Sequence, residues 1–249
     1  MAKDLNEAVY TEIAPLMYHS VAPRHDDPYQ LTVRPERFRK QLRSLRRLGR
    51  TGTSVSNLLH AWQQGSQKRL VGLTFDDGYA DFAENALPVL QRYGFTATLF
   101  VIAGRLAGSN EWDREGTRKA LLTADQLREV ASAGVEIGSH GMHHVSLPSV
   151  GDAELASEIH ESRRILQEIT GQEITGFCYP YGHLDERTVK AVEAAGYEYA
   201  CAISETQFTG QYAIRRTFIR DGDSPEQLWL KNTVQSLLAN KSSRMAGRA

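Results

Sequence analysis

Residues 70–79 are Leu-Val-Gly-Leu-Thr-Phe-Asp-Asp-Gly-Tyr, a buried-strand pattern that ends in two adjacent carboxylates and a glycine. The apolar part is typical of a central strand, and Gly78 can turn the chain after it. In a barrel of parallel strands, the carboxyl ends of the strands form the active face. The turn can bring Asp76 and Asp77 into one cavity but into different environments, so that one binds a metal ion and the other acts as a base. The alternative is a pair of solvated turn residues, because aspartate is favoured in turns.

Similar apolar runs recur along the chain, with helical patterns between them. Strands that alternate with helices imply parallel pairing. About seven strands without a glycine-rich dinucleotide fingerprint favour a barrel over an open, doubly wound sheet. We therefore predict an α/β fold, a (β/α) barrel of about seven parallel strands. The predicted strands are residues 14–18, 70–75, 96–102, 135–137, 176–179, 197–203 and 213–219.

Three helix starts can be predicted from the residues that precede them. Thr123 is followed three residues later by Gln126, which is the pattern of a capping box. Asp152 and Asp185 are the predicted N-caps of two further helices.

The chain of 249 residues has the composition of an ordinary globular protein, 41% hydrophobic and 24% charged, which excludes disordered and collagen-like classes. Without an internal repeat or linker, we predict one domain. Its barrel spans residues 14–239, after an N-terminal extension at 1–13 and before a polar, disordered tail at 240–249.

The charge and the apolar content also limit the partners and the location. A net charge of -1 gives no general attraction to nucleic acid, which we do not expect as a partner. No secretory pattern starts the chain, and no apolar run has the length of about 18 residues that a membrane span needs. We therefore expect a cytoplasmic protein. Cys178 and Cys201 are predicted to be buried thiols rather than a disulfide.

Residues 34–50 carry eight basic residues and one acidic residue, with apolar residues at helical spacing. The favoured interpretation is a surface helix whose apolar stripe packs on the barrel. The alternative is a peripheral contact with an anionic membrane.

A second cluster of functional residues is His140-Gly141-Met142-His143-His144. One helical turn would place His140 and His144 on the same side. His143, at i+3, is the alternative second ligand. Two imidazoles and one carboxylate suit Zn²⁺ or another divalent first-row ion such as Co²⁺, Ni²⁺ or Mn²⁺. Three protein ligands leave one position open for water, so the residues predict a site that hydrolyses an amide or an ester.

These motifs resemble those of the polysaccharide deacetylases, which share the nodulation-factor deacetylase homology domain and form family four of the carbohydrate esterases. Residues 74–78 match the first motif, and His140 and His144 match the second. The resemblance implies a distorted (β/α) barrel in which Asp76 is the general base. Asp77, His140 and His144 would be metal ligands, and the backbone N–H of Tyr181 would bind the oxyanion.

Two further segments resemble the branch that contains the biofilm poly-N-acetylglucosamine deacetylases. They are Pro-Leu-Met-Tyr-His-Ser-Val at residues 15–21 and Phe-Cys-Tyr-Pro-Tyr-Gly at residues 177–182. Asn110, Trp112 and Asp113 also resemble this branch.

The sequence departs from the family pattern at three places. Gly141 stands where the family has a Ser or Thr that braces the loop. Cys178 stands where it has an arginine that pairs with the base; Arg215 or Arg216 could replace that arginine, and Arg216 is preferred.

The third departure concerns the general acid, because the late Leu-x-x-His motif is absent. His19 is the first candidate and His183 the second, while water or Asp76 acting twice are alternatives. The alternative for His19 is a structural, hydrogen-bonded histidine.

We predict a metal-dependent hydrolase that removes N-acetyl groups from an N-acetylhexosamine-containing glycan or glycoconjugate. The alternatives are an O-acetyl carbohydrate esterase and a degenerate barrel that binds glycan without turnover. A cytoplasmic location favours a precursor as substrate, such as a sugar nucleotide, an oligosaccharide or a lipid-linked sugar. Trp112, Tyr79 and Tyr181 could support sugar rings. The sequence does not determine the oligomeric state.

Overall fold

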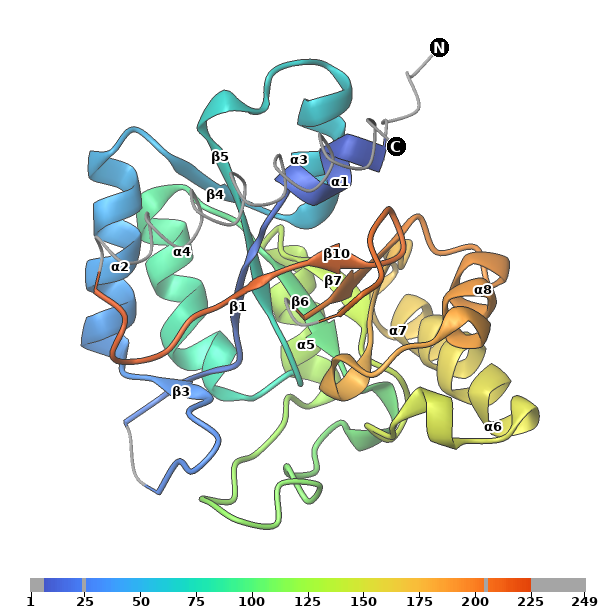
Figure 1. The fold of residues 1–249 in the computed structure, drawn as a ribbon. Coiled ribbons are helices and arrows are strands. Elements are labelled where there is room, and N and C mark those ends of the chain that lie inside the picture. The colour runs from blue at the N-terminus through green and yellow to red at the C-terminus, as the bar shows by residue number, and fades with distance from the viewer. Residues whose placement is uncertain (1–6, 24–25, 204–205, 225–249) are drawn as a thin grey trace.

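The computed structural model describes residues 7–23, 26–203 and 206–224. Within these residues a parallel sheet curves into a nearly closed barrel, and helices pack around it (Figure 1). The tail predicted at 240–249 and the boundary predicted at residue 239 lie outside the described residues. The predicted N-terminal extension contains helix α1 (Glu7–Glu12), and its Tyr10 is buried.

Every ladder of the sheet is parallel, as the alternation of strands and helices predicts. Strand β4 (Thr51–Thr53) pairs with β5 outside the main path, and β2 (Ser20–Val21) pairs with β3 (Thr32–Val33) in a separate ribbon. The main path runs in the order β10 (Ile214–Arg215), β9 (Tyr199–Ala202), β8 (Gly176–Cys178), β7 (Glu136–Ser139), β6 (Thr98–Val101), β5 (Leu70–Phe75), β1 (Leu16–Tyr18) and β11 (Thr217–Phe218). The predicted distorted (β/α) barrel is therefore confirmed, with eight strands on this path.

The last predicted strand, residues 213–219, is wrong as a single element. It contains two short strands, because the chain here leaves one edge of the sheet and joins the other. Ile214 is paired with Cys201 on β9, whereas Thr217 is paired with Leu16 on β1. Arg216 lies between the two ladders. This crossing brings the two edges of the barrel together.

The helices alternate with the strands around the barrel. Their bounds are α2 (Pro35–Arg47), α3 (Val55–Gln63), α4 (Leu87–Tyr93), α5 (Ala124–Ser132), α6 (Asp152–Ala156), α7 (Ser162–Thr170) and α8 (Glu186–Ala194). Short 3-10 or π turns are η1 (Gln67–Arg69), η2 (Phe82–Ala86), η3 (Ala103–Arg105), η4 (Leu147–Ser149), η5 (Ser157–Glu161) and η6 (Pro180–Gly182). None of the described helices is long and apolar enough to cross a membrane.

Two of the three predicted N-caps are confirmed. The side chains of Thr123 and Asp185 each accept the N3 backbone N–H within a complete capping box. The prediction for Asp152 is wrong, because Gly151 is the N-cap and Asp152 is already the first helical residue. Its carboxylate instead accepts from Arg187 Nη1 at 2.7 Å.

Helix α2 packs its apolar stripe into the core of the barrel. Phe38, Leu42 and Leu45 are buried, and the Phe38 ring lies 5.3 Å from that of Tyr18. Leu48, one turn further along, is 55% exposed. The core-packing interpretation of this helix is confirmed, and its buried stripe is not available for insertion into a membrane.

We expect Phe38→Ala to lower the free energy of unfolding by about 3–5 kcal/mol, because it leaves a cavity among packed rings. Leu48→Ala, at the C-cap of α2, should change it by less than about 0.5 kcal/mol. Urea denaturation of both variants measures the difference. Equal effects would contradict the packing described for α2.

Candidate active site

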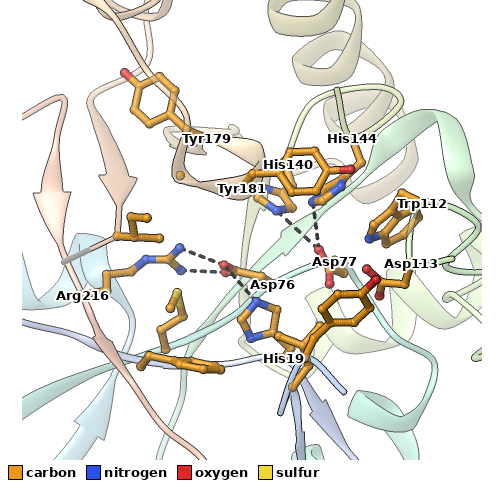
Figure 2. A pocket seen from close by; sticks show the side chains of 16 residues that line it. His19, Asp76, Asp77, Trp112, Asp113, His140, His144, Tyr179, Tyr181 and Arg216 are labelled. Atoms are coloured by element: carbon orange, nitrogen blue, oxygen red, sulfur yellow. Dashed lines mark hydrogen bonds and ion pairs between the residues drawn. The ribbon is translucent and has the colours of Figure 1, made fainter. Parts of the chain in front are cut away.

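A cavity of about 380 Å³ opens at the carboxyl ends of the strands. Most of the predicted site residues line it, although they come from distant parts of the chain (Figure 2). Asp76 and Asp77 follow β5, and His140 follows β7. The remaining predicted residues in this lining are His19, Trp112, His144, Tyr181 and Arg216.

Three buried side chains could hold a metal ion on one side of this cavity. Asp77 Oδ1 lies 3.4 Å from His140 Nε2 and 3.5 Å from His144 Nε2. Zinc bonds of about 2.0–2.2 Å in a tetrahedral arrangement place ligand atoms about 3.4 Å apart. The spacing and the donor types therefore fit a divalent ion such as Zn²⁺.

The protonation of these groups is set by burial and by their mutual contacts. Burial lowers the pKa of His144 to about 3, so its imidazole is in the neutral form that binds metals. Burial opposes the ionised form of Asp77, but the neighbouring imidazoles outweigh it and lower the pKa of the carboxyl. Asp77 is therefore ionised and His144 is neutral, as metal ligation requires. Burial opposes the charged form of His140, but Cys178 and Asp77 outweigh it and raise the pKa of this imidazole, so His140 must release a proton when a metal ion binds.

The loop that carries the histidines is not helical, and the predicted helical turn is wrong. Gly141 and His144 have left-handed φ angles of 77° and 62°, so the chain turns back on itself between them. The buried carboxylate of Glu158 accepts the N–H of Met142 at 2.7 Å and that of His143 at 3.1 Å. Glu158 thus braces the loop from a neighbouring helical segment.

The same carboxylate bears on one departure from the family pattern, Gly141, and on the alternative ligand His143. A Cβ at Gly141 would lie 2.8 Å from Glu158 Oε2, so a larger residue would disturb this brace. His143, the alternative ligand, directs its Nδ1 to Glu158 Oε1 at 2.7 Å. The structure therefore does not bring His143 to Asp77.

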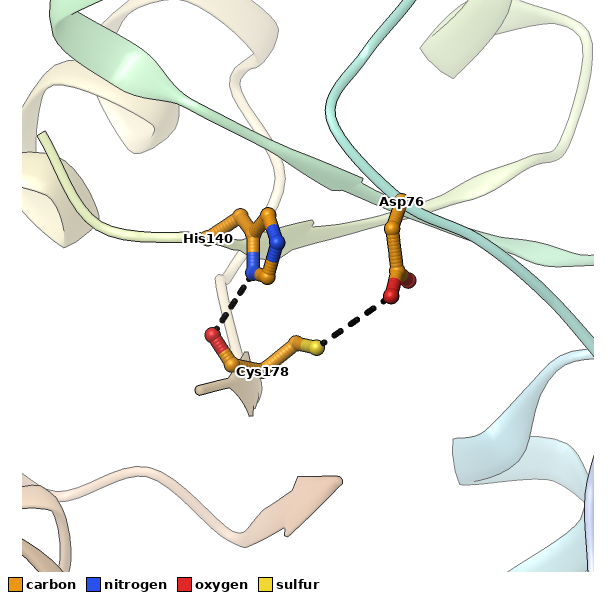
Figure 3. Close-up of side chains that lie close together, drawn as sticks. All are labelled: Asp76, His140 and Cys178. Atoms are coloured by element: carbon orange, nitrogen blue, oxygen red, sulfur yellow. Dashed lines mark hydrogen bonds between the residues drawn. The ribbon is translucent and has the colours of Figure 1, made fainter. Parts of the chain in front are cut away.

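A second group, formed by Asp76, His140 and Cys178, also has metal-binding atom types (Figure 3). The groups that surround it make it unsuitable for a metal ion. His140 Nδ1 lies 2.8 Å from the carbonyl oxygen of Cys178, and Arg216 Nη2 lies 3.0 Å from Cys178 Sγ. A guanidinium already supplies the positive charge there, so a metal ion would be repelled.

Asp76 and Arg216 form a buried, bidentate ion pair. Arg216 Nη1 donates to Asp76 Oδ1 at 2.6 Å, and Nη2 donates to Oδ2 at 2.8 Å. Burial alone would raise the pKa of Asp76, but the charge and hydrogen bonds of Arg216 outweigh it and lower that pKa. Asp76 is therefore ionised. Arg215 points elsewhere, because its Nη2 donates to the carbonyl of Thr206.

The thiols are buried and free, as predicted, and they are paired neighbours on β8 and β9. Cys178 is nevertheless more than a small apolar residue. Its Sγ lies 3.6 Å from Asp76 Oδ2 and contacts the guanidinium of Arg216. The small side chain of Cys178 thus leaves room for the guanidinium of Arg216, which lies between β10 and β11.

The two candidate acids lie in different places. His19 Nε2 is 4.0 Å from Asp76 Oδ2, and its side chain is 14% exposed. His183 lines a separate cavity, where its Nδ1 lies 3.0 Å from Ser146 Oγ. Of the two, the structure brings only His19 to the cavity of Asp76.

Aromatic rings line the mouth of the cavity beside His144. The Tyr181 ring lies 4.3 Å from the His144 ring and is 45% exposed, and the Trp112 ring lies 4.7 Å from it on another side. Tyr181 has a left-handed φ of 58°, within the turn η6. Tyr79 is only 1% exposed, so the prediction that it supports a sugar ring is wrong.

Sequence reasoning gave Asp113 no role, although it lines the cavity. Its Oδ2 accepts from Tyr79 Oη and Asn110 Nδ2, each at 3.3 Å. Burial, together with the charge of Asp77, raises the pKa of its carboxyl. The only sequence signal for it was the Asn-x-Trp-Asp segment, which does not show what the carboxylate faces.

We expect Arg216→Met to lower the free energy of unfolding by about 3–5 kcal/mol, because Asp76 would remain as an unpaired buried charge. Adding Asp76→Asn should recover most of this loss. Thermal and urea unfolding of the two single variants and the double variant measure the coupling. Additive losses would contradict a direct buried pair.

The comparisons with known proteins agree with the motifs and the fold. The family model for polysaccharide deacetylases matches residues 63–200. The YxkH protein of Bacillus subtilis (strain 168) is 31% identical over 215 aligned residues, covering 84% of this chain and 72% of that protein. The poly-β-1,6-N-acetyl-D-glucosamine N-deacetylase of Staphylococcus aureus (strain MRSA252) is 25% identical over 203 residues, covering 76% and 68% of the two chains.

A solved structure extends this similarity to three dimensions. The Streptococcus pyogenes deacetylase PplD, in complex with acetate, has a TM-score of 0.74 and 26% identity, covering 88% of this chain and 97% of that chain. Since the family model covers more than half of the sequence and the barrel matches as well, the chain belongs to the polysaccharide deacetylase family.

Proposed function

We propose that this protein is a metal-dependent hydrolase that removes N-acetyl groups from an N-acetylhexosamine-containing glycan. The observation that carries the proposal is the convergence of Asp77, His140 and His144 beside a second, separately paired carboxylate, Asp76. Such a pair of carboxylates in different environments can divide metal binding and base catalysis between them.

In this proposal Asp77, His140 and His144 hold a divalent ion, for which Zn²⁺ fits best and Co²⁺, Ni²⁺ or Mn²⁺ are alternatives. The bound ion supplies a Lewis acid that activates water and polarises the acyl carbonyl. The cavity leaves space for water and substrate because the three side chains approach from one side.

Asp76 is the proposed general base. It accepts a proton from the water that attacks the acyl carbon. Arg216 donates to both of its oxygens and the Cys178 thiol donates to Oδ2, so a lone pair for the proton remains on Oδ1. Arg216 thus orients the carboxylate and keeps it ionised. It acts through Asp76 and is a positioning residue.

The reaction also needs a hydrogen-bond donor for the oxyanion and an acid that protonates the leaving nitrogen. The Tyr181 backbone N–H is the proposed donor to the oxyanion. His19 is the proposed acid, which transfers a proton to the leaving nitrogen as the C–N bond breaks. Its position beside Asp76, at 4.0 Å, supports this role. Acetate and a free amine are the products.

The substrate is proposed from the family and from one relative. The Staphylococcus aureus relative is named for its action on poly-β-1,6-N-acetyl-D-glucosamine, which supports an N-acetylated glycan here. Exposed Tyr181 offers a ring on which a sugar can rest. A lipid-linked sugar, contact of residues 34–50 with a membrane, and a cytoplasmic location stay predictions.

We expect purified protein to release acetate from N-acetylglucosamine oligomers when Zn²⁺ or Co²⁺ is added, and to lose this activity with a chelator. Asp77→Ala should abolish both metal binding and turnover. Asp76→Asn should retain the metal and lower kcat by about 10²–10⁴-fold. Asp125→Asn, an exposed carboxylate on α5, is the matched control. Acetate release that is unchanged both by the chelator and by Asp77→Ala would contradict the metal mechanism.

Acetylated xylan in the same assay tests the alternative of an O-acetyl esterase. A higher kcat/KM on the xylan than on the N-acetylated oligomers would favour that alternative. Glycan binding without acetate release from either substrate would favour the barrel without turnover.

We expect His19→Ala to lower kcat on the N-acetyl substrate by about 10²–10⁴-fold. On 4-nitrophenyl acetate the loss should be below about tenfold, because its leaving group departs without a proton. Steady-state rates on both substrates measure this contrast. Equal losses would assign His19 a structural role instead.

A further inference from the structure

The side chain of His19 is held by few contacts of its own. Its Nε2 lies 4.0 Å from Asp76 Oδ2, which is beyond hydrogen-bond distance (Figure 2). Its Nδ1 is buried and has no hydrogen-bond partner among the described residues. Its ring meets that of Phe218 edge to face, with centroids 5.7 Å apart. The place of this imidazole in the cavity therefore depends on how the backbone at residue 19 is held.

One hydrogen bond holds the chain before His19. The carbonyl of Tyr18, the last residue of β1, accepts the backbone N–H of Asp76 at 3.0 Å. The proposed base therefore fixes, through its own backbone, the residue that precedes the proposed acid. This contact leaves the two soft dihedral angles of residue 19 unset, so a second contact after His19 is needed to direct its side chain.

Asp81 supplies that second contact. Its Oδ2 accepts from Ser20 Oγ at 2.6 Å, and its Oδ1 accepts the N–H of Val21 at 3.0 Å. An aspartate that precedes a helix usually caps it. Asp81 precedes η2 but makes no side-chain cap hydrogen bond, and its two oxygens bind β2 instead. The segment that carries the base thus also holds the chain after the acid.

Lys119 completes this network from a third segment. Its Nζ donates to Ser20 Oγ at 2.7 Å and also to Thr32 Oγ1 on β3. Ser20 is buried, so its hydroxyl lies between the ammonium of Lys119 and the carboxylate of Asp81. A buried polar network whose members are all hydrogen-bonded is rigid. The two charged side chains therefore hold β2 in one position.

We infer that Asp81, supported by Lys119, is a positioning residue that places His19 to protonate the leaving nitrogen. The inference rests on the proposed function, in which His19 is the acid. Proton transfer requires the imidazole to be within hydrogen-bond reach of that nitrogen, and a misplacement of about 1 Å can lower a rate about 10²-fold. Asp81 does not line the cavity, so it acts through the backbone of β2.

The test is a double-mutant cycle with two substrates. Asp81→Ala should lower kcat on N-acetylglucosamine oligomers by about 10–10²-fold. On 4-nitrophenyl acetate the loss should be below about threefold, because its leaving group departs without a proton. In the His19→Ala background, Asp81→Ala should have no further effect on the N-acetyl substrate. A merely structural role of Asp81 would lower the rates on both substrates in both backgrounds.

Two other variants apply the same test if Asp81→Ala does not fold. Asp81→Asn retains an acceptor for the N–H of Val21 and should lose less activity than Asp81→Ala. Ser20→Ala removes the shared hydroxyl and should show the same contrast between the two substrates. Glu84→Ala is the control, since Glu84 is an exposed carboxylate on η2. Circular dichroism melting verifies that each variant is folded.

Chemical modification of histidines by diethyl pyrocarbonate, followed by mass spectrometry, gives a readout without turnover. The side chain of His19 is 14% exposed and should react slowly in wild type. Asp81→Ala should raise its rate of modification severalfold, because the backbone beside it is released. The rate of His60, an exposed histidine on α3, should not change.

Equal losses on the two substrates in Asp81→Ala overturn the inference, and so does an unchanged modification rate of His19 in that variant. Equal losses in His19→Ala also overturn it, because His19 would then not be the acid. If wild type releases no acetate, the proposed function fails. In that case the modification rate of His19 still decides whether Asp81 holds it in place.

Discussion

Two carboxylates buried side by side at the end of β5 impose the main constraint on this molecule. A buried carboxylate without compensation costs several kcal/mol, so Asp76 and Asp77 each need their own partner. Asp77 has a left-handed φ of 73°, which takes it out of the strand and allows both side chains to face one cavity. Asp76 then meets a guanidinium, and Asp77 meets two imidazoles. This division of partners gives two chemically identical side chains different properties.

The partner of Asp76 also closes the barrel. Arg216 lies between β10 and β11, where the chain crosses from the β9 edge of the sheet to the β1 edge. Its Nε donates to the carbonyl of Ala202 on β9, and its Nη1 reaches Thr74 on β5 as well as Asp76. One side chain therefore connects the crossing to two strands and to the site. Closure of the sheet and neutralisation of the carboxylate depend on the same contacts.

The sequence predicted those features that local patterns encode. Apolar runs located the strands, and the capping boxes at Thr123 and Asp185 located two helix starts. Features that depend on distant contacts could not be found in this way. The brace from Glu158 to the histidine loop is one example, because a carboxylate in a helical segment normally indicates a solvated face. The split of the last strand is another, since only the closed sheet shows that residues 213–219 have two partners. Glu158 also keeps His143 away from the other candidate metal ligands, because its carboxylate binds His143 Nδ1.

The position of Arg216 bears on how a missing motif residue is interpreted. Cys178, in place of the arginine of the third motif, is one of two reasons to consider a barrel without turnover, and the absent late histidine is the other. In a parallel barrel, however, the carboxyl ends of all strands converge, so a charge can reach one point from several strands. A small thiol at position 178 admits a guanidinium from position 216, which contacts both the thiol and Asp76. What the site needs is a positive charge at Asp76, not an arginine at one sequence position. The substitution at Cys178 is therefore weak evidence against catalysis, because the charge that it removes is restored by Arg216.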